Sequence, residues 1–272
     1  MLDRYAVFGH PIAHSKSPRI HSAFAAQTGQ NMGYEAHLVP LDGLLQKIND
    51  FAATGGLGAN ITLPFKEEAY RIATQLSPQA QRAGAVNTLR FQNGHILGDN
   101  TDGVGLVRDL SLNKGIKLAG QRVLLLGAGG AARGVLQPLL QTHPSCLHIA
   151  NRSENKAAQL AREFSDLGSI SGAGYDSLLG QSFDLVINAT SASLSGDLPP
   201  LPAGLFAPSA AAYDMMYGAK ETSFLKFARE EGAALLADGL GMLIEQAAEA
   251  FFIWRGIRPD TAPLFAALRA DQ

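Results

Sequence analysis

A glycine-rich turn between a short apolar run and a helical pattern is the feature that most restricts how this chain can fold. The turn, Gly127–Ala132, directly follows Arg122–Leu126. The order matches G-x-G-x-x-A. In this motif the first glycine allows a tight turn, the second lets a pyrophosphate approach the backbone, and the small final residue, here Ala132, lets the helix pack close to the strand. Unpaired amides at the helix start favour that anion. We therefore predict a Rossmann-type nucleotide-binding domain, with the cofactor against Gly127, Ala128, Gly129, Gly130 and Ala131.

The end of the next expected strand indicates which dinucleotide is bound. NAD sites place an acid there to accept a hydrogen bond from the ribose 2′-hydroxyl. This chain has Asn151, Arg152 and Ser153, and Lys156 follows one helical turn later. Two cations and a hydroxyl suit a 2′-phosphate, since a charge-assisted hydrogen bond contributes about 1.5–3 kcal/mol. We predict NADP; the alternative is that Arg152 and Lys156 are simply solvated at a strand end.

Short apolar runs alternate with helical stretches along the chain, which is typical of an α/β fold built from βα units. A length of 272 residues suits two domains. We predict a substrate-binding domain over 1–103 and a Rossmann domain over 104–239. We also expect the last helix, within about 240–272, to pack back on the first domain and complete it.

The same patterns place the individual elements. We expect strands at Tyr5–Phe8, Tyr34–Leu38, Gly58–Ile61, Thr88–Gln92, Arg122–Leu126, Leu147–Ala150, Leu185–Asn188 and Ala211–Asp214. We expect helices at Pro18–Thr28, Leu44–Ala53, Lys66–Leu76, Ala131–Gln141 and Lys156–Phe164, another from Asp102 toward Leu112, and a proline-rich loop at Leu198–Pro208.

Composition excludes several classes. Hydrophobic residues make up 46% and charged residues 17%, as in globular proteins, and a net charge of −2 gives no basic surface for nucleic acid. The single cysteine, Cys146, allows no internal disulfide and fits the cytoplasm. No leader pattern, membrane-spanning apolar run or metal-ligand spacing is present, and we expect His10, His14 and His21 to be loop or packing residues. The sequence leaves the oligomeric state open, a homodimer included.

The first domain contains polar residues in apolar or glycine-rich surroundings. Ser15 and Ser17 are two apart before Pro18, so in an extended loop their hydroxyls share a side and suit a carboxylate; alternatively, Ser17 only caps a helix. Asn60 and Thr62 likewise share one side at a strand end.

Three further polar positions follow in the same domain. Lys66 begins a helix, where the dipole disfavours a cation, and such a broken local rule often marks a functional site. Asn87 enters a strand, and Asp102 begins the next helix after Thr101. Without further context, the pattern at Lys66 fits a surface lysine equally well, and the pattern at Asp102 fits a helix cap.

Taken in order, these motifs resemble the shikimate dehydrogenase family over essentially the whole chain. They are Ser-x-Ser-Pro, Asn-Ile-Thr-x-Pro-x-Lys, Gly-Ala-Val-Asn-Thr and Gly-x-Asn-Thr-Asp-Gly, then Gly-Ala-Gly-Gly-Ala-x-Arg and Asn-Arg-Ser. The resemblance implies reversible NADPH-dependent reduction of 3-dehydroshikimate to shikimate, on the route to chorismate and the aromatic amino acids. Where the family commonly has an acid after the Lys66 helix, this chain has Ser77-Pro78.

The resemblance also implies roles for individual residues. Lys66 and Asp102 would be the catalytic pair. The substrate would contact Ser15, Ser17, Asn60, Thr62, Asn87, Thr101, Tyr217 and Gln246, with the serines on its carboxylate. Besides the glycine turn and Asn151, Arg152, Ser153 and Lys156, the cofactor would contact Thr190, Met215 and Gly239.

Three alternatives remain at this stage. A quinate/shikimate dehydrogenase would accept more substrates and some NAD. A methylene-tetrahydrofolate-type dehydrogenase would leave the two serines and Asp102 unexplained. A silent NADP-sensing module would not need Lys66 and Asp102 together.

Overall fold

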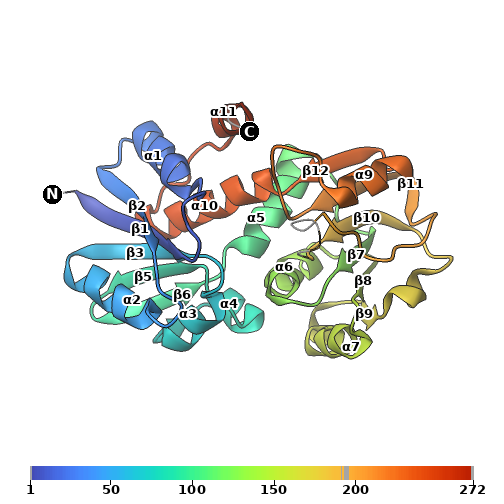
Figure 1. The fold of residues 1–272 in the computed structure, drawn as a ribbon, viewed down its shortest axis with the longest axis horizontal. Helices are drawn as coiled ribbons and strands as arrows, with labels where there is room; N and C mark the ends of the chain where they lie inside the picture. Colours follow the sequence, from blue (N-terminus) through green and yellow to red (C-terminus); the bar gives the residue numbers. More distant parts are fainter. Residues whose placement is uncertain (1, 191, 193–195, 271–272) are drawn as a thin grey trace. The chain divides into compact units, whose positions relative to one another are not determined.

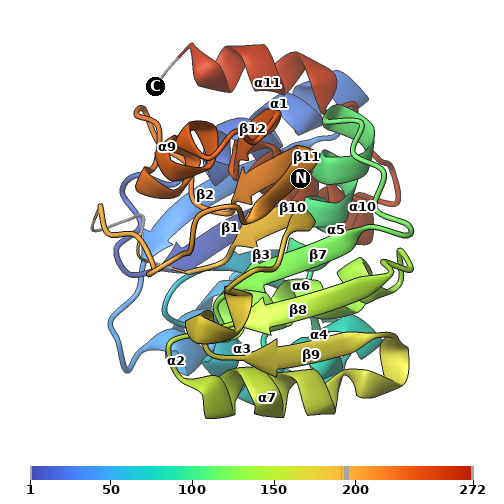
Figure 2. The same ribbon diagram turned by 90° about the vertical axis from the view of Figure 1, so that its right-hand side faces the viewer.

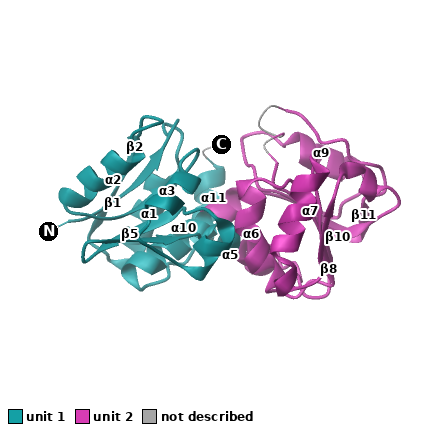
Figure 3. Cartoon of the chain, turned by 90° about the horizontal axis from the view of Figure 1, so that it is seen from below, with its two compact units in different colours: residues 1–105, 244–271 teal, residues 106–243, 272 magenta. Residues whose placement is uncertain are grey.

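The computed structural model describes residues 2–190, 192 and 196–270, and the chain divides into two compact units. Of the described residues, the first unit comprises 2–105 and 244–270, and the second comprises those within Leu106–Leu243 (Figure 3). The division falls within two helices, α5 (Asp102–Arg108) and α10 (Leu240–Arg255).

The first unit is built on a six-stranded mixed sheet in the order β2-β1-β3-β5-β6-β4 (Figure 1). Its strands are β1 (Asp3–Gly9), β2 (Met32–Leu38), β3 (Gly56–Ile61), β4 (Gln75–Leu76), β5 (Thr88–Gln92) and β6 (His95–Asp99). The helices are α1 (Ser17–Thr28), α2 (Leu44–Ala53), α3 (Lys66–Ile72), α4 (Pro78–Ala83) and α11 (Ala262–Arg269), besides the parts of α5 and α10 in this unit.

Two features of this sheet differ from the expectation. β5 and β6 form an antiparallel hairpin, because Asn93 and Gly94 both adopt positive φ, 52° and 77°. Asn-Gly is the typical sequence of such a two-residue turn, and this signal was missed. The helix expected over Lys66–Leu76 ends at Ile72, because Gln75–Leu76 pairs with β6 as strand β4.

The two faces of the first sheet are covered by different helices (Figure 1). α2, α3 and α4 cover the face that includes Phe8, Ile61 and Leu89. α1 and α10 cover the other, where the Trp254 indole donates to the Leu89 carbonyl at 2.9 Å and stacks on Tyr5 at 4.6 Å. The predicted return of the last long helix onto the first unit is therefore confirmed.

The second unit is a parallel sheet in the order β12-β11-β10-β7-β8-β9, which Figure 2 shows edge to edge. The strands are β7 (Arg122–Leu126), β8 (Cys146–Ala150), β9 (Ile170–Ala173), β10 (Phe183–Asn188), β11 (Phe206–Asp214) and β12 (Leu235–Asp238). In chain order this arrangement is 3-2-1-4-5-6, the doubly wound dinucleotide fold. The predicted α/β class and Rossmann-type domain are confirmed.

The helices α6 (Gly130–Leu140) and α7 (Glu154–Glu163) pack on one face of this sheet, and α9 (Ser223–Glu230) packs on the other. Strands β9 and β12 were not expected, and β11 begins at Phe206, inside the predicted proline-rich loop. A π-helical turn, Asp109–Asn113, continues α5 toward the predicted end at Leu112. Within the part of the chain that is described, no helix is long and apolar enough to cross a membrane.

Gly58 on β3 has no room for a side chain. An added Cβ would lie 2.6 Å from the Leu89 carbonyl oxygen and 2.7 Å from the Trp254 indole nitrogen. We predict that Gly58→Ala lowers the free energy of unfolding by about 1–3 kcal/mol, the usual effect of overpacking. Gly174→Ala, whose Cβ would meet only the Glu154 Cβ at 3.8 Å, is the matched control. Equal urea midpoints for the two variants would contradict the prediction.

His21 on α1 is a packing residue, as expected. It is fully buried and stacks on Tyr34 at 4.2 Å, and burial lowers its pKa to about 3. Because the unfolded chain binds a proton near pH 6.5 and the folded chain does not, stability falls as the pH drops from about 6.5 toward 3.

We predict that this histidine alone makes unfolding about 2 kcal/mol easier at pH 5 than at pH 7. His21→Phe keeps the stacking and should remove that part of the pH dependence in urea titrations. His95→Phe, at an exposed position, should keep the wild-type pH dependence. An unchanged pH profile in His21→Phe would refute the assignment.

Candidate active site

Lys66 and Asp102 form an ion pair in the first unit, although they are 36 residues apart in sequence. Lys66 is the first residue of α3, just after β3, and Asp102 is the first residue of α5, just after β6. The Lys66 Nζ donates to the Asp102 Oδ2 at 2.5 Å. Their side chains are only 28% and 12% exposed, so Lys66 is not a freely solvated surface lysine.

Asn87 holds the other oxygen of Asp102. Its Nδ2 donates to Asp102 Oδ1 at 2.8 Å and to the Thr101 hydroxyl at 3.0 Å, and its Oδ1 accepts from the Thr101 amide at 2.9 Å. Gln246, on α10, presents Oε1 to the same Nδ2 at 3.3 Å. The structure thus brings five of the predicted catalytic and substrate residues into one network, in which Asn87, Thr101 and Asp102 are buried and Lys66 and Gln246 are partly buried.

Asn60 lies beneath this network rather than free beside it. Its Nδ2 donates to the Asn87 carbonyl and to the Thr88 hydroxyl, both at 3.1 Å, and its Oδ1 accepts from the Tyr34 hydroxyl at 2.7 Å. Because two of these bonds hold the Asn87 carbonyl and its neighbour Thr88, we expect Asn60 to support Asn87. The Thr62 hydroxyl has no hydrogen-bond partner among the described residues and remains available to a ligand.

The two serines lie at the entry to α1. Helix α1 begins at Ser17 itself, with Lys16 in the capping position and no side-chain cap, so the reading of Ser17 as an N-cap is wrong. Instead the Ser17 amide donates to the Ser15 hydroxyl at 3.3 Å. Complete burial raises the pKa of Tyr34, and a hydrogen bond from Ser17 offsets a smaller part of that rise. Ser17 is therefore linked through Tyr34 to Asn60.

Two residues that the sequence analysis did not single out hold these groups in place. Asn100, which is buried, accepts from the Asp102 amide at 3.1 Å and donates to the Ala85 carbonyl at 3.0 Å. Thr88 donates to the Asn87 Oδ1 at 2.9 Å. Both stand inside the quoted motifs, Gly-x-Asn-Thr-Asp-Gly and Gly-Ala-Val-Asn-Thr, which was the available signal.

In the second unit the glycine turn stands where the chain order of the strands reverses. Gly127 has φ +105°, and a Cβ there would meet the Ala189 backbone and the Thr190 side chain at 3.2–3.3 Å. Gly129 precedes α6, which begins at Gly130, and added Cβ atoms at Gly129 and Gly130 would meet nothing within 4 Å. The carboxyl ends of β7 and β10 thus form the switch point where dinucleotides bind, with open space over the turn.

The residues expected near the nicotinamide are also held together. A Cβ on Gly239 would lie 2.1 Å from the Met215 carbonyl oxygen, so only glycine permits this approach. Asn188 accepts from the Thr190 hydroxyl at 2.7 Å and donates to Asp214 at 3.2 Å. Tyr217 lies shortly after β11, and burial together with the Asp238 charge raises its pKa. The buried Asn188–Asp214 pair therefore holds the ends of β10 and β11 together.

The predicted 2′-phosphate site lies at the end of β8. Arg152, Ser153 and Lys156 are exposed, and none of their side chains has a hydrogen-bond or ion-pair partner among the described residues. Ser153 precedes α7 without capping it, and the Asn151 side chain donates to the Ser153 carbonyl at 3.0 Å. Two available cations and one available hydroxyl fit a dianionic phosphate.

The geometry of both units defines the class of protein. A Rossmann sheet with an open glycine turn binds a nicotinamide nucleotide, and a lysine–aspartate pair in a polar network can move a proton at an alcohol or ketone. Within the described residues no group of histidine, cysteine and carboxylate side chains could hold a metal. The class is a two-domain, nucleotide-dependent oxidoreductase.

Comparison with known proteins identifies the family. Residues 7–89 match the shikimate dehydrogenase substrate binding domain, residues 109–195 match shikimate / quinate 5-dehydrogenase, and residues 239–269 match the shikimate 5′-dehydrogenase C-terminal domain. The NADP(+) shikimate dehydrogenase of Dechloromonas aromatica is 63% identical over 99% of this chain and 98% of its own, and that of Nitrosospira multiformis is 60% identical over 100% and 98%. The chain belongs to the shikimate dehydrogenase family.

A solved structure supports the same conclusion. Shikimate 5-dehydrogenase from Thermus thermophilus, crystallised with NADP(H) and shikimate, is 37% identical, with a TM-score of 0.88 over the full length of both chains. The likeness covers both units, so the family assignment does not rest on the nucleotide-binding half alone.

We predict that Arg152→Gln raises the KM for NADP about tenfold or more and leaves the KM for the second substrate nearly unchanged, because one charge-assisted hydrogen bond is lost. Arg162→Gln, an equal change of charge at an exposed position on α7, is the control. Steady-state kinetics with NADP and NAD measure both constants. An Arg152→Gln variant with wild-type NADP affinity would remove this residue from the phosphate site.

Proposed function

We propose that this chain catalyses the reversible NADPH-dependent reduction of 3-dehydroshikimate to shikimate. The observation that carries the proposal is the Lys66–Asp102 pair held by Asn87, in a chain whose second unit is a Rossmann domain with cations suited to a 2′-phosphate. The curated relatives that are 60–63% identical bear the corresponding name, which favours this reaction over broader quinate and NAD use.

Lys66 is the group that moves the proton. NADPH, when bound to the second unit, supplies the hydride that reduces the ketone. The new oxyanion then needs a proton, which the Lys66 ammonium gives, and in the reverse direction the neutral amine takes the proton from the hydroxyl. Asp102 holds the Lys66 Nζ and keeps lone pairs for a neighbouring hydroxyl of the substrate.

The remaining polar groups bind the substrate in this proposal. Ser15 and Ser17 hold its carboxylate, while Thr62, Asn87, Thr101, Gln246 and Tyr217 hold its hydroxyls and Asn60 keeps Asn87 in place. Because most of these side chains are fixed by one another, they need little reordering when substrate binds, which lowers the entropic cost of orientation.

The domains follow the same division of labour. We assign substrate binding to residues 1–103, completed by about 240–272, and NADP binding to residues 104–239. One copy of the chain carries every group named above, so catalysis needs no second copy; a homodimer, which the sequence leaves open, is tested by analytical ultracentrifugation. We place the enzyme in the cytoplasm, where reduced Cys146 and a supply of NADPH are expected.

The direct test offers shikimate or quinate with NADP or NAD and follows the absorbance of reduced nicotinamide. We expect fast reduction with shikimate and NADP alone. Comparable rates with quinate or NAD would indicate the broad-specificity relative instead. Binding of NADP without turnover of any substrate would overturn the proposed function and leave a nucleotide-binding domain.

We predict that Lys66→Ala lowers kcat by about 10²–10⁴-fold, the usual contribution of a general acid–base, and changes the KM for shikimate much less. Lys117→Ala, at an exposed position of the second unit, should be as active as the wild type. Full-progress kinetics in both directions measure the effect. Near-normal turnover in Lys66→Ala would exclude this lysine from proton transfer.

A further inference from the structure

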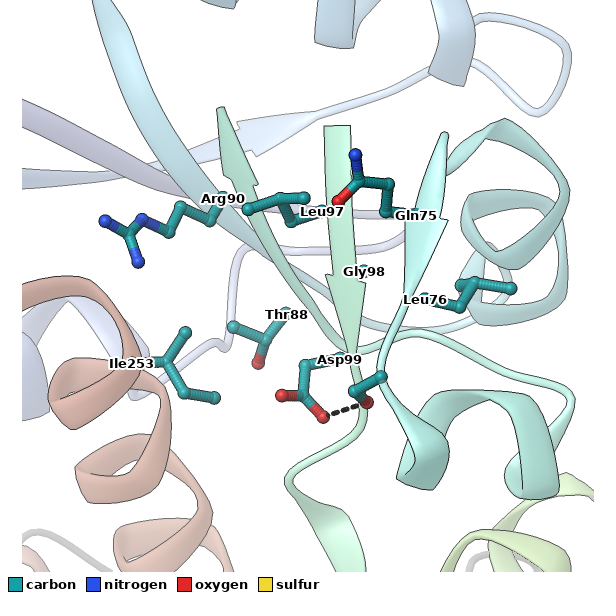
Figure 4. A pocket seen from close by; sticks show the side chains of 9 residues that line it. Gln75, Leu76, Thr88, Arg90, Leu97, Gly98, Asp99 and Ile253 are labelled. Atoms are coloured by element: carbon teal, nitrogen blue, oxygen red, sulfur yellow. Dashed lines mark hydrogen bonds between the residues drawn. The ribbon is translucent and has the colours of Figure 1, made fainter. Parts of the chain in front are cut away.

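A cavity of about 260 Å³ lies against the first sheet, on the face that α10 covers (Figure 4). Thr88 and Arg90 line it from β5, and Leu97 and Asp99 line it from β6. These side chains share a face, because Thr88 pairs with Asp99 and Arg90 with Leu97 across the hairpin. None of the roles proposed above uses Arg90, Leu97 or Asp99.

Asp99 presents an unused carboxylate oxygen to the cavity. Its Oδ1 accepts from the Ser77 hydroxyl at 2.6 Å and from the Asn100 amide at 2.7 Å. Its second oxygen has no hydrogen-bond partner among the described residues and points toward Thr88 and Ile253 in Figure 4. Burial raises the pKa of this carboxyl, and the negative charge of Glu249 adds a smaller rise, whereas a cation placed against the free oxygen would favour the ionised carboxylate.

Arg90 supplies the opposite charge. It is half-buried, and among the described residues its guanidinium has neither an ion-pair nor a hydrogen-bond partner. In the hairpin it is the diagonal neighbour of Asp99, and such neighbours lie about 7–8 Å apart. A guanidinium without a partner is well suited to a carboxylate, which it can bind through two parallel hydrogen bonds.

The space between these charges is partly apolar and small. Leu76, Leu97 and Ile253 contribute hydrocarbon surface. The volume lies below the roughly 300–1,000 Å³ of pockets for drug-sized ligands. A dicarboxylate would be repelled at Asp99 and a diamine at Arg90, whereas an ammonium, a carboxylate and a short apolar group would match all three features.

We propose that this cavity binds a small α-amino acid with an apolar side chain, its ammonium on Asp99 and its carboxylate on Arg90. The site is linked to the catalytic pair by two paths. In the first path, the Thr88 hydroxyl donates to Asn87 Oδ1, and the Asn87 backbone N–H donates to the Asp99 backbone carbonyl at 3.0 Å. The Asp99 carboxylate also holds Asn100, which in turn holds the Asp102 amide.

Because of these links, the bound amino acid shifts the positions of Asn87 and Asp102 and changes the KM for shikimate about fivefold or more, the lower range of measured couplings between sites. This kinetic readout rests on the proposed function. The binding measurement does not rest on it, so a failure of the amino-acid site can be distinguished from a failure of the proposed function.

The experiment is isothermal titration calorimetry of the full chain with each of the common amino acids, in the presence of saturating shikimate to occupy the candidate active site. We expect one-site binding of an apolar amino acid at micromolar to millimolar concentration. Its N-acetyl and carboxamide derivatives, which lack one of the two charges, should each bind at least about tenfold more weakly.

Arg90→Gln should weaken binding about tenfold or more, while Arg71→Gln, an equal change at an exposed position of α3, should bind like the wild type. Circular dichroism and thermal unfolding verify that both variants fold. Absence of binding by every amino acid would overturn the proposal, as would equal binding of the charge-blocked derivatives or loss of binding through competition with shikimate. Binding that leaves the KM for shikimate unchanged, in enzyme that turns over, would overturn the link to Asp102.

Discussion

The side-chain amide of Asn87 is the interaction on which the candidate active site depends. It donates to Asp102 and Thr101 and accepts from the Thr101 amide, while Asn60 holds its backbone carbonyl from below. In a buried site each of these polar groups loses its water, so leaving one unpaired is costly and the fully paired arrangement is strongly favoured. The position of Lys66 then follows, because its ammonium is held by the carboxylate that Asn87 orients.

The second unit fixes its functional groups by a different means. There the backbone itself forms the site: a glycine with φ +105° turns the chain at the end of β7, and Gly239 lies against the Met215 carbonyl with no space for a Cβ. Side chains act one layer further out, where buried Asp214 and Asn188 hold Thr190 and the Met216 amide. The two units thus form their candidate sites by different means, a side-chain network in the first unit and an open backbone turn in the second.

Most of the fold could be predicted from local patterns, and the errors have identifiable causes. After Arg122, β7 is a continuous apolar run buried on both faces, and its bounds were predicted to the residue. β8 contains the partly exposed His148, and its predicted start was one residue late. β4, β9 and β12 are strands of two to four residues, too short to show a period, and only their partners in the sheet make them strands. The hairpin of β5 and β6 did carry a local signal, the Asn93-Gly94 turn, and the prediction missed the hairpin because it overlooked that turn.

The sequence by itself determined the class of fold, the glycine turn and the chemistry of the candidate site, because these depend on residue type and on spacing within one segment. Tertiary structure decided which polar residues touch. The Lys66–Asp102 pair joins α3 to α5, and the Gln246 contact joins α10 to Asn87, the residue before β5, across sequence separations of 36 and 159 residues. Tertiary structure also decided that Ser17 does not cap its helix and that the Asn60 side chain bonds to protein partners. No local pattern encodes such contacts, because each results from the packing of a whole unit.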